Sequence, residues 1–224
     1  MIARLVTMLV VGLFVLCTSA CTCDNVVIGP HDPTPLPTAS STMSELIASL
    51  SDPDYHVRLA SIYALRDMGS AAEPAVSALI IVLSDDVSDV RTAAAYAFGA
   101  IGPAGASAVP ALVQVLRSDK YGPARVAAAE SLGRIGDTSA VPILAEVLWD
   151  QGAHMSLRIE VSQATAWLTG AEFPDCEPGP HGYKLNDEGE PLIVIAAREW
   201  WMSEGRYQEW PDHDPENPEE AGVS

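Results

Sequence analysis

The side chains that could do chemistry are few and scattered along the chain. Cys176 and His181, in the stretch CEPGPH, are close enough to supply two metal ligands. A structural zinc site takes four ligands, and nothing near this pair supplies a convincing third and fourth. The sequence also lacks a Gly-Xaa-Ser-Xaa-Gly nucleophile motif and a glycine-rich phosphate-binding loop. We therefore predict no metal, no cofactor and no catalytic activity.

The cysteine that suggests a modification is Cys21. Arg4 is followed by an apolar run over residues 5–16, and small residues at 18–20 precede the cysteine. Twelve residues are too few to span a bilayer, which takes about 20, but suit the core of a secretory signal. The segment resembles a bacterial lipoprotein signal, whose cysteine is lipidated and becomes the first mature residue. It departs from the usual motif at Thr18, where a leucine normally stands.

This resemblance implies an exported lipoprotein, anchored to a membrane through Cys21 and facing the periplasm or the cell exterior. Two alternatives stay open. An ordinary signal peptidase could cut before Cys21 and release a soluble protein, or the apolar run could remain as an uncleaved anchor. Export also permits a disulfide, and Cys23 and Cys176 could form one or stay separate.

The middle of the chain repeats itself. Four stretches, beginning VRLASIY, VRTAAAY, ARVAAAE and LRIEVSQ, carry an arginine as their second residue, at steps of 33, 34 and 33 residues. A fixed period of this length is typical of a stacked array of small units. The four repeat arginines are Arg58, Arg91, Arg125 and Arg158.

Each unit is predicted to be a pair of helices. The first halves, such as VPALVQVL at 109–116, place apolar residues at helical spacing. The second halves are rich in alanine, and we expect their small side chains to let neighbouring helices approach closely. A glycine that can adopt the left-handed conformation closes each second half. These glycines are Gly69, Gly102, Gly136 and Gly170.

Two helix starts can also be read from the sequence. Thr42 and Glu45 resemble a capping box that opens the first helix. Asp52 before Pro53 is predicted to be the N-cap of the next helix, with proline as its first residue.

These motifs resemble HEAT repeats, specifically the short bacterial type also called phycobilisome-lyase-like. The matching residues are Asp89-Val90-Arg91, the SLGRIG stretch at 131–136, and Ala-Val-Pro at 108–110 and 140–142. The resemblance implies an all-α right-handed α-solenoid of about four helix pairs with a C-terminal capping helix. It also implies a structural role for the four repeat arginines, each meeting a turn aspartate of a neighbouring unit. A row of anion-binding arginines is the alternative.

Two enzyme classes share this scaffold. Deoxyhypusine hydroxylase uses adjacent His-Glu pairs, and no such pair occurs here. Phycobilin lyases hold a tetrapyrrole but are not exported. A small-molecule-binding or lyase-like protein, which would use Trp167, Trp200 and Trp201, therefore stays an alternative only.

The C-terminal part breaks the period. Residues 190–205, EPLIVIAAREWWMSEG, are predicted to form a helix whose Trp200 and Trp201 cover the last repeat, because arrays need a terminal cap. A ligand-stacking platform is the alternative. The predicted segments are a signal peptide (1–20), a Cys-led Pro/Ser/Thr tether (21–42), the array (43–170), the cap (171–208) and an acidic disordered tail (209–224).

The charge distribution excludes one class of partner. The net charge is −18, with 14 acidic and 8 basic residues in the array and 14 acidic and 3 basic residues beyond it. No basic stripe is present, so we predict no nucleic-acid binding.

One column of the repeat varies in a way that suggests binding. Tyr63, Tyr96, Glu130 and Gln163 each follow a repeat arginine by five residues. The period stacks them side by side, and we predict that they contribute to a surface for a protein partner, with half-buried packing as the alternative. We therefore expect an exported, lipid-anchored scaffold that binds a protein outside the cytoplasm; a soluble periplasmic structural protein is a further alternative.

Overall fold

The computed structural model describes residues 41–150, 152–173 and 183–208. All of them belong to the second of two units into which the chain divides, residues 34–224. Several predictions from the sequence fall outside the described residues. These are the signal peptide (1–20), the lipidation site Cys21, the tether up to residue 40, the residues Cys23, Cys176 and His181, and the tail (209–224).

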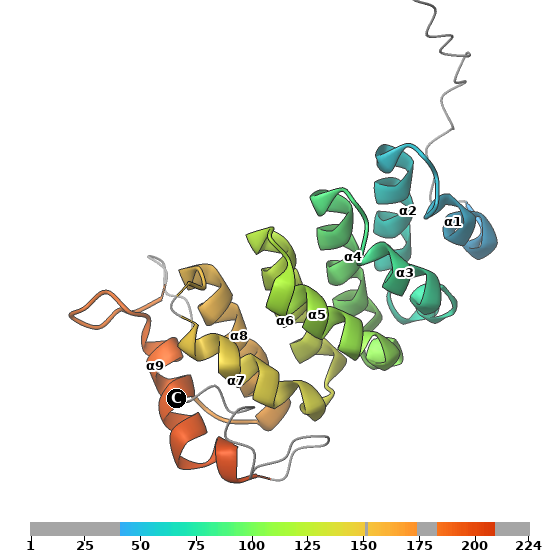
Figure 1. Ribbon diagram of the computed structural model, residues 1–224. Helices are drawn as coiled ribbons and strands as arrows, with labels where there is room; N and C mark the ends of the chain where they lie inside the picture. The colour runs from blue at the N-terminus through green and yellow to red at the C-terminus, as the bar shows by residue number, and fades with distance from the viewer. Residues whose placement is uncertain (1–40, 151, 174–182, 209–224) are drawn as a thin grey trace, which may run out of the picture. The chain divides into compact units, whose positions relative to one another are not determined.

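The described residues form four consecutive helix pairs and one further helix, and the predicted all-α solenoid is confirmed. In Figure 1 the second helices of the pairs lie side by side in one row, with the first helices in a second row. The pairs are α1 (Met43–Ser49) with α2 (Tyr55–Asp67), α3 (Val76–Val82) with α4 (Ser88–Ile101), α5 (Val109–Ser118) with α6 (Gly122–Ile135), and α7 (Val141–Trp149) with α8 (Met155–Thr169).

Short 3-10 turns connect the pairs, and a ninth helix follows them. The turns are η1 (Gly69–Ala75), η2 (Gly102–Ala108) and η3 (Thr138–Ala140). The further helix is α9 (Leu192–Ser203), followed by η4 (Gly205–Tyr207).

The helix starts agree with the sequence in one case and differ in the other. Thr42 accepts from the backbone N–H of Glu45 at 3.4 Å, and Glu45 accepts in return from the backbone N–H of Thr42 at 2.7 Å, so the capping box is confirmed. The prediction for Asp52 is wrong, because Asp54 caps α2 by accepting from the backbone N–H of His56 at 2.9 Å. Asp52 instead accepts from the backbone N–H of Asp54 at 2.8 Å, which holds the preceding turn.

The four closing glycines all have positive φ, between 56° and 85°, as their positions required. Gly136 and Gly170 are left-handed C-caps of α6 and α8. Gly102 has φ 69° with ψ −142°, outside the left-handed helical region. Gly69 follows Met68, which is the C-cap of α2. A side chain with a Cβ would be strained at each of these positions.

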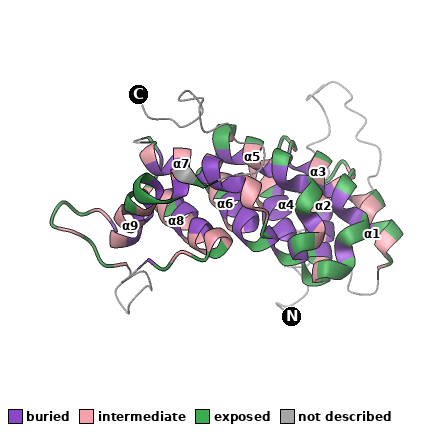
Figure 2. Ribbon diagram, turned by 90° about the horizontal axis from the view of Figure 1, so that it is seen from below, coloured by how far each residue is buried: buried purple, intermediate pink, exposed green. Residues whose placement is uncertain are grey.

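Small side chains bring successive second helices into close contact, as predicted. The Ser131 hydroxyl donates to the backbone carbonyl of Ala95 at 2.7 Å and joins α6 to α4. On the other side of α6, a Cβ added to Gly133 would lie only 2.9 Å from the Cα of Ala164 in α8. Figure 2 shows the long buried faces of α4 and α6 in the middle of the array.

By length and composition alone, one helical run among the described residues could cross a membrane. This run, Ser88–Ser118, consists of α4, η2 and α5, and half of its most apolar window is buried. Its apolar residues supply the core of the array.

The non-repeat segment closes the C-terminal end. Helix α9 packs against α7 and α8, and Trp201, 2% exposed, lies against Val141 and Ala145 of α7. Trp200 is half-buried and packs beside Phe173, with 6.4 Å between the ring centroids.

The close contact at Gly133 predicts a sharp effect of one methyl group. Gly133→Ala is expected to lower the free energy of unfolding by about 1–3 kcal/mol, as is typical of overpacking, although alanine is the better helix former by about 1 kcal/mol. Urea denaturation measures the change. Gly122→Ala is the control, because no atom lies within 4 Å of its added Cβ. Equal stability of the two variants would contradict the close approach of α6 and α8.

Candidate functional site

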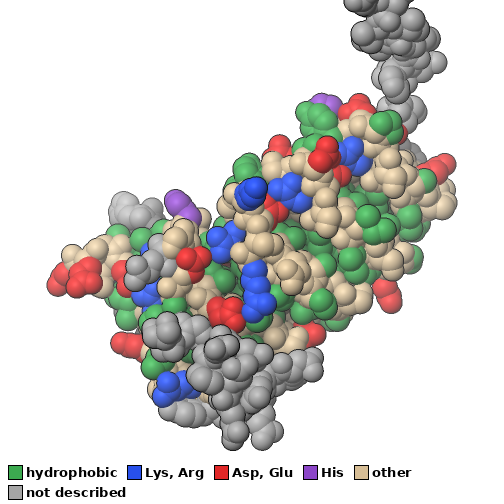
Figure 3. All heavy atoms as spheres, viewed as in Figure 1, with side chains coloured by type: hydrophobic (Ala, Val, Ile, Leu, Met, Phe, Trp, Pro, Cys, Tyr) green, Lys and Arg blue, Asp and Glu red, His purple; other side chains and the backbone are tan. Residues whose placement is uncertain are grey.

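The four repeat arginines each meet an acidic residue of the next structural unit. The distances are 2.8 Å for Arg58 Nε–Asp85 Oδ2, 2.6 Å for Arg91 Nε–Asp119 Oδ2, 3.5 Å for Arg125 Nη2–Asp150 Oδ2 and 3.1 Å for Arg158 Nη1–Glu190 Oε1. Figure 3 shows basic and acidic side chains adjacent to one another along successive units. The first three acids are aspartates that follow the first helix of the next pair, as the resemblance to HEAT repeats implied. For Arg158 that expectation is wrong, because its partner Glu190 is a glutamate of the non-repeat segment.

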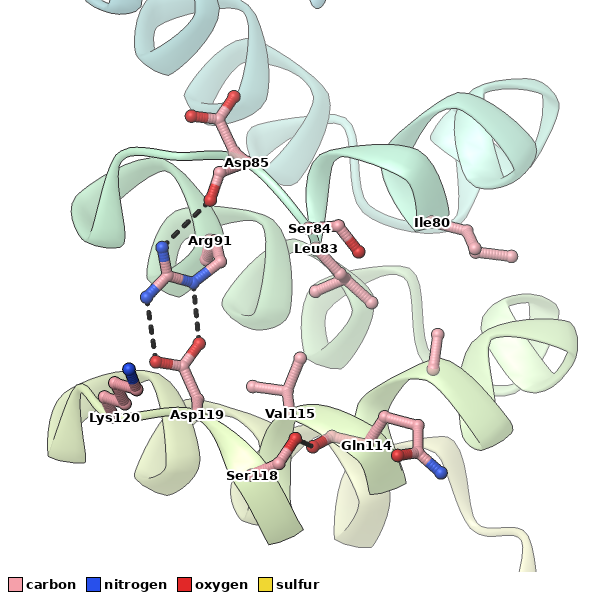
Figure 4. A pocket seen from close by; sticks show the side chains of 11 residues that line it. Ile80, Leu83, Ser84, Asp85, Arg91, Gln114, Val115, Ser118, Asp119 and Lys120 are labelled. Atoms are coloured by element: carbon pink, nitrogen blue, oxygen red, sulfur yellow. Dashed lines mark hydrogen bonds and ion pairs between the residues drawn. The ribbon is translucent and has the colours of Figure 1, made fainter.

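The contact at Arg91 shows why this series, which we call the arginine ladder, is structural. Arg91 binds Asp119 through two nitrogens, at 2.6 and 2.8 Å, and donates to the backbone carbonyl of Asp85 at 2.9 Å (Figure 4). The hydrogen bond from Arg91 lowers the pKa of Asp119 below its ordinary value, against the opposing effect of burial. The guanidinium is thus engaged by groups of the protein itself.

Two cavities lie along the ladder. One of about 520 Å³ is lined by Arg91 and Asp119, and one of about 430 Å³ is lined by Arg58 and Asp85. In each cavity the arginine is already paired with an aspartate of the protein. An anion would therefore have to compete with that carboxylate for the guanidinium.

The four residues of the candidate binding column lie on the second helices, but they differ in exposure and in contacts. Tyr63 and Tyr96 are 45% and 37% exposed, so their rings are available at the surface. Glu130 accepts from Arg134 at 2.8 Å and is partly exposed. Gln163 donates to the hydroxyl of Tyr183 in the non-repeat segment, which ties this fourth member of the column to the end of the array.

Three neighbours of this column were not predicted to bind a partner. They are Arg134, Glu160 and Trp167. Trp167 of α8 is 52% exposed, and the guanidinium carbon of Arg134 lies 5.9 Å from its ring centroid. Glu160 is half-buried and one helical turn before Ala164, beside the contact of α6 with α8. The sequence could have indicated Glu160. The position two residues after the repeat arginine holds alanine in the first three units and glutamate in the fourth. These residues are Ala60, Ala93, Ala127 and Glu160.

The electrostatics show that these groups act on one another. Partial burial and the neighbouring Glu130 carboxylate raise the pKa of Glu160 from 4.5 to about 7, with Arg134 partly offsetting them. Partial burial, Glu130 and Glu160 raise the pKa of Tyr96 above its ordinary value. Tyr96, Glu130 and Glu160, from α4, α6 and α8, thus form one series across three helices, which we call the carboxylate row.

A hollow lies beside this row. A cavity of about 570 Å³ is lined by Tyr96 and Val126 and by residues at the N-terminal ends of α6 and α8, including Pro123 and His154. The surface formed by the second helices of the pairs, which we call the second-helix face, is therefore hollowed next to the exposed ring of Tyr96.

The other predicted ligand-binding aromatic residues are placed differently. Trp201 is buried and Trp200 is half-buried, both packed at the end of the array. Of the three tryptophans predicted as alternatives for binding a small molecule, Trp167 is the most exposed to solvent. Among the described residues no group of three His, Cys, Asp or Glu side chains could hold a metal ion.

Comparison with protein families agrees with the geometry of stacked helix pairs. The model for HEAT repeats matches residues 36–99 and 76–164, which together cover more than half of the chain. The chain therefore belongs to the HEAT-repeat family. A search of curated proteins found no match.

The raised pKa of Glu160 predicts a pH-dependent effect on stability. Stability linked to its protonated form is fully present below its ordinary pKa of 4.5 and is lost as the pH rises through about 7. Glu160→Gln is neutral at every pH. We expect it to raise the free energy of unfolding by about 1 kcal/mol at pH 8, after allowing for solvent screening, and to have little effect at pH 5.

Chemical denaturation at the two pH values measures this difference. Glu73→Gln, which changes an exposed glutamate in η1, is the matched control. A gain in stability of Glu160→Gln that is the same at pH 5 and pH 8 would contradict the assigned environment of Glu160.

Proposed function

We propose that this HEAT-repeat scaffold is exported, anchored to a membrane through a lipid on Cys21, and binds a protein partner outside the cytoplasm without catalysing a reaction. We assign it to the phycobilisome-lyase-like type on the motifs at 89–91 and 131–136. The observation that carries partner binding is the set of exposed aromatic side chains, Tyr63, Tyr96 and Trp167, on the second-helix face.

The close packing of the second helices supports this proposal. Helices α4, α6 and α8 are joined by buried small residues, so the spacing between their exposed side chains is set before a partner arrives. A preorganised surface loses less conformational entropy on binding. Tyrosine and tryptophan are enriched among the residues that dominate binding energy at protein interfaces.

Two flanking contacts also favour a role in recognition. The guanidinium carbon of Arg66 lies 5.1 Å from the ring centroid of Tyr63, and that of Arg134 lies 5.9 Å from the ring centroid of Trp167. Arginines beside aromatic rings combine charge with apolar area, a mixture common at interfaces.

The membrane anchor is proposed from the N-terminal sequence. A short apolar run and small residues before Cys21 resemble a lipoprotein signal. The proline-rich segment that follows Cys21 would link the lipid to the array and so hold the scaffold at the membrane.

The aromatic column gives the first test. We expect the double variant Tyr63→Ala with Tyr96→Ala to weaken the partner complex at least tenfold, as for residues that contribute about 1–2 kcal/mol. The measurement is the affinity for a protein that co-purifies in stoichiometric amount from the native membrane. Tyr55→Ala with Tyr121→Ala is the matched control, because both tyrosines are exposed to a similar extent but precede or begin their helices.

Unchanged affinity in the folded Tyr63/Tyr96 variant would sink the proposal that this face binds a protein. A bound small molecule with no stoichiometric polypeptide would favour the ligand-binding alternative.

Lipid anchoring has a separate test. Cys21→Ser should move the protein from the membrane fraction to the soluble fraction, because the thiol that carries the lipid is gone. Mass spectrometry of the wild-type N-terminal peptide should show a lipid on Cys21, and Cys23→Ser serves as the control. A mature, unmodified Cys21 would favour the soluble periplasmic alternative.

A further inference from the structure

Glu130 and Glu160 of the carboxylate row lie about one turn from a close contact between α6 and α8. A Cβ on Gly133 would be 2.9 Å from both the Ala164 Cα and a ring carbon of Trp167. Since α6 and α8 are equivalent helices of successive pairs, Glu130 and Glu160 lie about one turn earlier along the same contact. The electrostatic effect of Glu130 on Glu160 agrees with this placement.

Arg134 is the cation that acts on both carboxylates of this row. Arg134 donates to Glu130 at 2.8 Å and lies against Trp167. The Glu160 carboxylate forms no side-chain hydrogen bond or ion pair with any residue in the described part of the chain. Above the pKa of Glu160, at about 7, the two carboxylates therefore carry two negative charges against the one positive charge of Arg134. This excess lies on a partly buried surface, where an incoming cation would be bound more strongly than in open water.

The side chains around this charge suit an arginine. Its planar guanidinium can bond to carboxylate oxygens and stack on aromatic rings at the same time. Tyr96 of α4, which lies within electrostatic reach of both glutamates, offers an exposed ring. Trp167 of α8, which lies against Arg134, offers a second one.

Other cations and polyanions fit less well. A metal ion would need further ligands, and the described residues hold no group of three candidates. Phosphate-bearing ligands, such as nucleic acids and anionic lipid headgroups, would meet uncompensated negative charge.

We infer that the partner bound by the second-helix face inserts an arginine side chain between Glu130 and Glu160, beside Tyr96 and Trp167. This inference rests on the proposed function and specifies its partner: a protein segment with an arginine flanked by apolar residues. The arginine supplies the missing positive charge, and the flanking residues cover the exposed aromatic rings.

A defined peptide tests the inference even before the native partner is identified. The probe is the acetylated and amidated pentapeptide Ala-Leu-Arg-Leu-Ala, titrated into the full chain at pH 8 and followed by the indole N–H resonance of Trp167. The control peptide carries citrulline, which has nearly the shape of arginine but no charge. We expect the arginine peptide to bind at least fivefold more tightly and to shift the Trp167 resonance.

Two protein variants locate the effect. Glu130→Gln with Glu160→Gln should abolish the preference for arginine over citrulline, whereas Glu146→Gln, on α7, should retain it. Folding of each variant is checked by its unfolding transition. Equal binding of the two peptides by the wild-type chain, or an unchanged preference in the Glu130/Glu160 variant, would overturn the inference.

The native partner separates this inference from the proposed function. If the Tyr63/Tyr96 variant loses the partner and the Glu130/Glu160 variant keeps it, the face binds a protein but not through an arginine. If neither variant loses the partner, the proposed function itself fails.

Discussion

The close approach of the second helices is the constraint on which the rest of the structure depends. Gly133 leaves no room for a side chain against α8, and Ser131 replaces apolar packing with a buried hydrogen bond to α4. These contacts let α4, α6 and α8 pack closely enough for the first helices of their pairs to share one core with them. They also set the spacing of the residues on the outer side of the same helices.

The arginine ladder adds a second, directional connection at the turns. Each arginine reaches forward to an acid of the following unit, so each unit is linked to the next. At the last unit Glu190 takes this role and also pairs with Arg198 of α9 at 2.7 Å. The non-repeat segment thus reproduces the contact that a fifth unit would have made, and α9 covers α7 and α8.

The fold could be predicted from the sequence because its causes are periodic. Arginine, alanine and glycine recur at steps of 33 or 34 residues, and each recurring residue has one structural requirement. The start of α2 could not be predicted as well, because Asp52 and Asp54 are both able to cap and only the geometry of the turn decides between them.

The candidate site was harder to predict because it does not follow one column. Tyr96 and Glu130 belong to the column five residues after the arginines, whereas Glu160 and Trp167 come from positions that hold alanine, aspartate or arginine in other units. A helix face about 100° wide includes several such positions. The contact of Gln163 with Tyr183 depends on how the non-repeat segment folds back, which no repeat pattern specifies.

Binding of a protein by the second-helix face is tested most directly by a photo-cross-linking amino acid placed at position 96 in the native host. Position 81, an exposed site on the first helix α3, is the reference. We expect one specific cross-linked polypeptide from position 96 and none from position 81 after irradiation of intact cells. The same product from both positions, or no product from position 96, would contradict binding by this face.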